Sequence, residues 1–148
     1  MGCEKVQLMK RILVGLETGE THLWPALHAI NLAKRLGGRV AVLRMLPTGK
    51  SAEQLTQQQR GQGSFQERLE TLIEQARSQG VSVEYHVANG NYEDELVNFI
   101  REAKVDMLVL AAPHLLRRGR RHRESSISSI RHRVNCRIEL VYEKPETG

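Results

Sequence analysis

Residues 87–112 read VANGNYEDELVNFIREAKVDMLVLAA, and this stretch decides the fold class. A turn over residues 89–91 ends one strand-like run and leads into residues 92–103, which carry apolar side chains at helical spacing. Residues 107–112 are apolar at every position, which is typical of a central parallel strand buried on both faces. The succession of strand, helix and strand predicts a right-handed βαβ unit.

The same alternation extends in both directions along the chain. In the helical stretches, apolar residues recur every three and four positions. In the strand-like stretches, they either occupy every position or alternate with polar residues. Pro25 suits a first helical turn, and Gly37 suits a helix stop. The predicted helices cover residues 23–36, 64–79, 92–103 and 125–134, and the predicted strands cover residues 12–16, 40–43, 81–87, 107–112 and 138–142. This order predicts an α/β fold with an open five-stranded parallel sheet and helices on both faces.

Length and composition limit the class of protein. The 148 residues suit a single domain, with a predicted core from about residue 10 to residue 143. No apolar run approaches the length of a membrane span and no signal peptide is apparent, so we expect a cytoplasmic protein without membrane contact. Residues 47–63 are polar and aperiodic, which predicts a mobile loop. The two cysteines and six histidines show no ligand spacing, so no metal site is expected.

Residues 113–133 are strongly basic. They contain seven arginines and one glutamate, in a chain whose formal net charge is +5. This segment follows the predicted central strand, where ligands bind in open α/β sheets. Three interpretations stay open: a solvated basic loop, an anion site, and a surface for nucleic acid or an acidic protein. In the anion site, Arg117 would act together with Ser125 and Ser126, which are predicted to lie at a helix start with free N–H groups.

Three stretches carry a resemblance to a known family. They are residues 11–46 (RILVGLETGETHLWPALHAINLAKRLGGRVAVLRML), the stretch quoted first, and residues 125–142 (SSISSIRHRVNCRIELVY). In their order and spacing they resemble the universal stress protein family over about residues 10–143. The resemblance implies a Rossmann-like sheet with strand order 3-2-1-4-5. It also implies a homodimer joined through the last strand, about residues 137–143.

The resemblance further indicates a divergent ligand site. ATP-binding members carry an Asp after the first strand and a G-x2-G-x9-G-[ST] motif after the fourth, whose glycines let backbone N–H groups approach phosphate. Here Glu17 takes the Asp position, and the glycine positions fall at His114, Arg117 and Glu124; Ser125 alone matches. The candidate nucleotide or anion site comprises Glu17, Thr18, Met45, His114, Arg117, Ser125 and Ser126.

Taken together, these patterns predict a regulatory binding module of the stress response that does not hold ATP in the family's usual mode. No cofactor is expected, and ATP is the alternative ligand. No nucleophile and base are paired in the sequence, so no catalytic residue and no enzyme activity are expected, with weak ATP hydrolysis as the alternative. Two further alternatives are a switch that binds a phosphate ligand through the Arg-rich segment and an electrostatic adaptor using residues 117–133. The expected partners are a second copy of the chain and an unidentified protein.

Overall fold

Five parallel strands form one open sheet in the order β3-β2-β1-β4-β5, which confirms the predicted α/β fold. This computed structural model describes residues 10–17, 22–46, 64–112 and 120–142, with the backbone alone for residues 120–125. The strands are β1 (Arg11–Leu16), β2 (Arg39–Met45), β3 (Ser82–Ala88), β4 (Met107–Ala111) and β5 (Arg137–Val141). β3 and β5 lie at the two edges, and β1 and β4 lie side by side in the centre.

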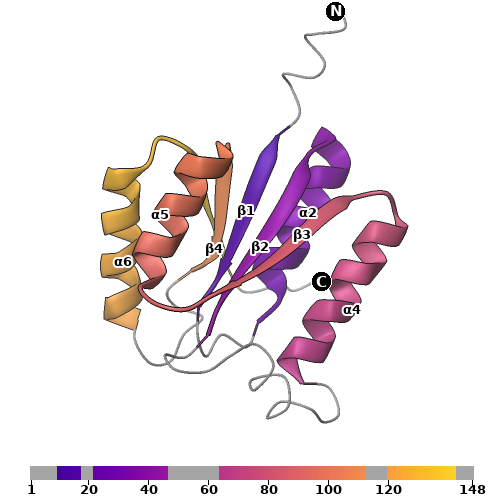
Figure 1. The fold of residues 1–148 in the computed structure, drawn as a ribbon, viewed down its shortest axis with the longest axis horizontal. Coiled ribbons are helices and arrows are strands. Elements are labelled where there is room, and N and C mark those ends of the chain that lie inside the picture. The colour runs from indigo at the N-terminus through magenta and orange to yellow at the C-terminus, as the bar shows by residue number, and fades with distance from the viewer. Residues whose placement is uncertain (1–9, 18–21, 47–63, 113–119, 143–148) are drawn as a thin grey trace, which may run out of the picture.

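Four helices cover the two faces of this sheet (Figure 1). They are α2 (Trp24–Leu36), α4 (Phe65–Ser78), α5 (Tyr92–Ala103) and α6 (Arg120–Arg133). α2 and α4 contribute to one hydrophobic cluster, while α5 and α6 contribute to the other. Neighbouring residues of β1 point into opposite clusters, since Ile12 joins the first and Leu13 the second. Every residue of β4 is buried, as its continuous apolar run predicts.

Local sequence signals set the helix ends. Pro25 lies in the first turn of α2, and Gly37 closes that helix in the left-handed conformation, with φ of 74°. The side chain of Ser64 accepts a hydrogen bond from the backbone N–H of Glu67 at 3.1 Å at the start of α4. Asn91 caps α5 in the same way. These signals place α2, α4 and α5 within one residue of their predicted bounds.

The last helix was predicted too short. It was expected over residues 125–134 and instead begins at Arg120 and ends at Arg133. Arginine has a high helix propensity, so the basic stretch before Ser125 continues the helix although it adds no apolar side chain to the pattern. β2 is also longer than predicted, since it runs to Met45.

The sequence analysis also predicted a mobile loop and no membrane-spanning helix. The predicted loop over residues 47–63 lies outside the described residues. Within the described part of the chain, no helix has both the length and the apolar character needed to cross a bilayer.

Candidate functional site

The candidate cleft lies where β1 and β4 end at the carboxyl edge of the sheet. β1 connects through α2 to β2 on one side, whereas β4 lies on the other side of β1. Such a reversal of strand order leaves a crevice beyond the strand ends, where ligands bind in open α/β sheets. The strand order therefore has its switch point at the edge where the sequence analysis places the candidate site.

Glu17 and Met45 meet at this edge. Leu16 of β1 is in register with Arg44 of β2, so Glu17, the residue after β1, comes next to Met45, the last residue of β2. Met45 is 2% exposed and belongs to the cluster under α5 and α6, whereas Glu17 is half-buried. This pair places one carboxylate and one apolar side chain at the same end of the cleft.

Gly15 brings α5 close to the cleft. A Cβ atom at this position would lie 2.9 Å from side-chain atoms of both Leu96 and Leu110. The absence of a side chain lets Tyr92, the first residue of α5, reach β1, where its hydroxyl donates to the Gly15 carbonyl oxygen at 3.4 Å. The start of α5 is thus seated against the strand that leads into the cleft.

Ser125 and Ser126 do not lie at a helix start. They are the sixth and seventh residues of α6, beyond the turn whose N–H groups lack partners within the helix. The prediction of free N–H groups at these serines was therefore wrong, because the preceding arginines extend the helix. Ser126 is 1% exposed, and its hydroxyl makes no hydrogen bond with any other residue that the structure describes.

Thr18, His114 and Arg117, which the sequence analysis also assigned to the site, lie outside the described residues.

At the far end of α6, Arg133 forms an ion pair with Asp94 in the first turn of α5, with 2.9 Å between Nη1 and Oδ1. Part of the basic charge therefore ties α6 to α5.

A buried polar cluster beside β2 was missed by the sequence analysis. Arg44 is 7% exposed, and its Nη1 donates to Oε1 of Gln66, which also accepts from the hydroxyl of Tyr85 at 3.2 Å. Nε2 of Gln66 donates to Glu70 at 2.8 Å, and the Arg44 guanidinium lies 4.9 Å from the centre of the Phe65 ring. Burial lowers the pKa of Arg44, which nearby Tyr85 and Glu70 partly offset, and burial raises the pKa of Tyr85.

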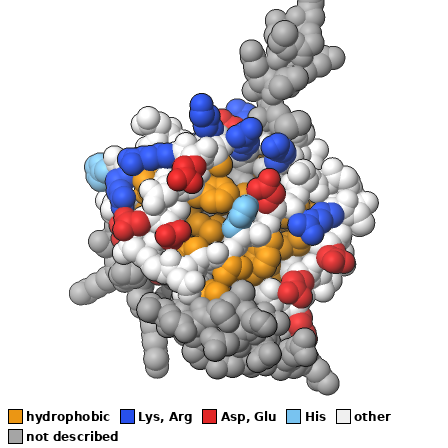
Figure 2. All heavy atoms as spheres, viewed as in Figure 1, with side chains coloured by type: hydrophobic (Ala, Val, Ile, Leu, Met, Phe, Trp, Pro, Cys, Tyr) orange, Lys and Arg blue, Asp and Glu red, His pale blue; other side chains and the backbone are white. Residues whose placement is uncertain are grey.

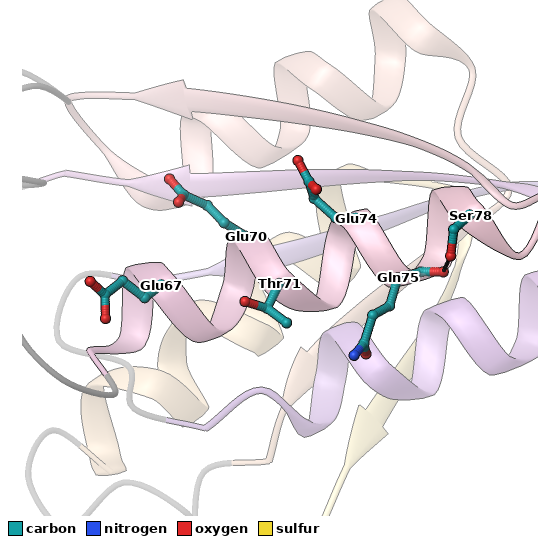
Figure 3. Close-up of a pocket in the computed structure, with 6 residues that line it drawn as sticks. All are labelled: Glu67, Glu70, Thr71, Glu74, Gln75 and Ser78. Carbon is teal, nitrogen blue, oxygen red and sulfur yellow. Dashed lines mark hydrogen bonds between the residues drawn. The ribbon is translucent and has the colours of Figure 1, made fainter.

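An acidic depression lies along the outer side of α4. Figure 3 shows its six lining side chains, which all come from this one helix: Glu67, Glu70, Thr71, Glu74, Gln75 and Ser78. The Ser78 hydroxyl donates to the backbone oxygen of Gln75 at 2.7 Å. No three carboxylate, imidazole or thiol groups of the described residues converge as a metal site. The depression is therefore a solvated helix face and holds no ligand set.

Comparison with known proteins settles the family. A family model described as the universal stress protein family matches residues 9–141. This chain belongs to the universal stress protein family. The predicted resemblance is thereby confirmed, while no curated protein matches the chain.

Solved structures of universal stress proteins share the fold. One in complex with cAMP has a TM-score of 0.67 and 18% identity, with 93% of this chain and 99% of that chain covered. One from Archaeoglobus fulgidus in complex with dAMP has a TM-score of 0.60 and 17% identity, with 89% and 96% covered. One from Arabidopsis thaliana with AMP bound has a TM-score of 0.57 and 13% identity, with 91% and 92% covered. At these identities the likeness extends to the fold.

Proposed function

We propose that this universal stress protein is a regulatory binding module that acts without catalysis and does not hold ATP in a glycine-lined cradle. The observation that carries the proposal is the position of Ser125 and Ser126 in the interior of α6. A phosphate cradle needs free N–H groups at a helix start and glycines that let the backbone approach. In this chain the helix N–H groups at these serines are already used, and Glu124 precedes them with a like charge to phosphate.

Relatives with bound nucleotides support a retained adenosine end. Universal stress proteins with 13–18% identity to this chain have been crystallised with cAMP, dAMP or AMP. Glu17 and Met45 lie side by side at the corresponding end of the cleft. A ligand with one phosphate or none would need the fewest contacts from the segment that lacks the family's glycines. The module would then respond to a small nucleotide and pass the signal to another protein.

A second candidate is a switch that binds an anion through the Arg-rich segment. The buried Ser126 hydroxyl, which lacks a partner among the described residues, supports it because a buried polar group without a hydrogen bond is costly. Arg117 and its neighbours would replace the glycine cradle with guanidinium forks. The chain's formal net charge of +5 also supports an electrostatic adaptor for nucleic acid or an acidic protein.

The proposed assembly is a cytoplasmic homodimer. Its support is the edge position of β5, whose outer side has no strand partner within the described chain. Exposed strand edges readily accept another strand. A second copy adding along β5 would leave both clefts accessible, since the clefts lie at the ends of the strands.

Calorimetric titration of AMP and ATP into the purified protein tests the proposal. It is run at about 50 mM and about 300 mM salt, because screening separates a formed pocket from a diffuse basic field. We expect AMP to bind once per chain at both salt concentrations and ATP to bind no more tightly than AMP. ATP binding at least tenfold tighter than AMP at the higher salt would overturn the proposal.

Two matched variants separate the candidates. Replacement of Arg117 and Arg118 by Ala should leave AMP binding and dimerisation unchanged if the cradle is absent, and should weaken binding of any phosphate ligand if the Arg-rich switch exists. Phosphate release from ATP above the blank, measured on the same samples, would indicate hydrolysis. Binding of AMP that disappears at the higher salt would favour the adaptor.

A further inference from the structure

We infer that a groove between α5 and the start of β2 and β3 is the docking site for a partner protein segment that carries an aliphatic side chain next to carboxylates. The groove lies on the sheet face that carries α5, at the end where the strands begin. The nucleotide cleft lies at the opposite ends of the same strands. The inference therefore stands independently of the proposed nucleotide function.

The groove has an apolar floor and a small hollow. Its apolar lining includes Ala41 of β2, Phe99 and Ala103 of α5, and Val105. The hollow measures about 70 Å³. Pockets for small organic ligands usually reach about 300 Å³ or more, so this hollow is too small for a free metabolite of that kind. Its volume and apolar lining fit a single aliphatic side chain of a partner.

The groove exists because no described helix covers the start of β2 and its neighbour β3 on this face. α4 packs on the other face, and the cluster under α5 takes in β1, β4 and the later part of β2, where Leu43 and Met45 are buried. Figure 2 shows apolar side chains gathered in the middle of this face. On β3, His86 meets the edge of Phe99 with 5.0 Å between ring centres, and its Nε2 lies 3.0 Å from Oε1 of Glu84. These polar groups form one rim and leave the floor accessible.

The opposite rim is positive. Arg11 and Arg39 line it, and the two residues face each other across the β1–β2 pairing. Arg11 donates from Nη1 to the backbone oxygen of Ala103 at 2.7 Å, which keeps its guanidinium beside the groove. The Arg39 side chain has no hydrogen bond or ion pair with any residue that the structure describes. Figure 2 shows further Lys and Arg side chains along this edge of the molecule.

The charges define the occupant. Two arginines and one acid, Glu84, line the groove, and Glu84 is paired with His86. Asp106 at this end of the sheet accepts from the Arg11 backbone N–H at 2.9 Å. Lys10 and Lys104 are exposed at the same end of the sheet, as is Glu102, so the described residues there still carry more cations than acids. An acidic partner segment matches this excess of cations. Nucleic acid fits less well, because Phe99 is the one aromatic ring among the lining residues and the edge of His86 already packs against it.

Selection from a random peptide library tests the inference. The full-length protein is immobilised and exposed to phage-displayed peptides of about twelve residues, a length that spans a surface groove. We expect enriched peptides to combine a Leu, Ile or Val with neighbouring Asp or Glu residues. Failure to enrich any peptide, or enrichment of basic or purely polar peptides, would overturn the inference.

Three variants locate the binding. Ala103→Leu fills the hollow and Arg39→Glu reverses the rim charge, and each should weaken the selected peptide by at least about tenfold, the effect of roughly 1.4 kcal/mol. Arg35→Glu is the matched control, because Arg35 is exposed in the last turn of α2 on the other face of the sheet. Each variant is first checked by thermal unfolding, so that loss of binding is not loss of the fold.

Other occupants give distinct results. If Arg39→Glu dissociates an oligomer in sedimentation experiments, a second copy of the chain covers the groove and the inference of a separate partner fails. If a duplex DNA probe binds, and Arg39→Glu weakens its affinity whereas Ala103→Leu does not, the surface binds phosphate by charge alone and the inference also fails. Equal peptide affinity for all three variants would place binding elsewhere.

Discussion

Replacing Gln66 by Leu should destabilise the protein, because this side chain joins the buried polar groups beside β2. Its Oε1 accepts hydrogen bonds from Arg44 and Tyr85, and its Nε2 donates to Glu70. Gln66 is 6% exposed and Arg44 is 7% exposed, so water cannot readily replace the lost partner. Leu has a similar volume, which keeps the steric change small.

The expected loss can be estimated bond by bond. A hydrogen bond to a charged group contributes about 1.5–3 kcal/mol, and one between neutral groups about 0.5–1.5 kcal/mol. The bond to Glu70 counts little, because that carboxylate is exposed to solvent. The Phe65 ring still lies near the Arg44 guanidinium in the variant and offsets part of the loss. We therefore expect Gln66→Leu to lower the free energy of unfolding by about 2–3 kcal/mol and Tm by roughly 5–10 °C.

Urea and thermal unfolding of three variants measure this effect. Gln75→Leu is the control, since Gln75 lies on the exposed side of the same helix, and it should change the free energy of unfolding by less than about 0.5 kcal/mol. Adding Arg44→Met to Gln66→Leu should recover most of the loss, because an apolar pair has no buried charge to satisfy. A loss for Gln66→Leu equal to that of the control would refute the estimate, as would no recovery in the double variant.

Three further outcomes are expected. Gly38→Ala should lower stability by about 1–3 kcal/mol in thermal unfolding, because a Cβ there would lie 2.8 Å from the backbone oxygen of Lys10; an unchanged Tm would contradict this. Burial raises the pKa of Cys136, so in a variant with the other cysteine replaced by Ser, the pH midpoint of its alkylation rate should lie above the ordinary thiol pKa of about 8.5. For the same reason the free energy of unfolding should fall as pH rises from the pKa of the unfolded thiol through the raised pKa of the folded one. A midpoint at or below the ordinary value would count against burial of this thiol. His28→Ala should cost less than about 1 kcal/mol, because the 2.5 Å contact between His28 and Glu139 is partly exposed, and a double-mutant cycle with Glu139→Gln gives its coupling energy.

The sequence predicted those parts of the fold whose residues repeat a burial pattern. β4 is apolar at every position and buried at every position, and α5 begins and ends at the predicted residues. The first turns of α6 carry no such pattern, because residues 120–125 contain no apolar side chain in the sequence. A prediction based on apolar spacing therefore starts this helix too late, although the arginines before it favour a helix.

The candidate site was predictable only where it follows from strand ends. Glu17 and Met45 are neighbours because parallel strands end at one edge, a relation that the order of elements fixes. The cluster around Arg44 could not be predicted in this way. An arginine within a strand ordinarily suggests exposure, and its burial here depends on Phe65 and Gln66, which lie more than 20 positions further along the chain.

Helix α5 links the two ends at which we place ligands. Tyr92 at its start contacts Gly15 beside the proposed nucleotide cleft, and Ala103 at its end lines the proposed docking groove. A helix moves as a rigid element, so a displacement of Tyr92 by a ligand in the cleft would shift Ala103 and reshape the hollow. Thermodynamic linkage then requires the reverse effect of equal size, since a partner that prefers one position of α5 changes nucleotide affinity by the same factor. The two sites would act as one switch only if their ligands prefer different positions of this helix; with equal preference they would bind independently.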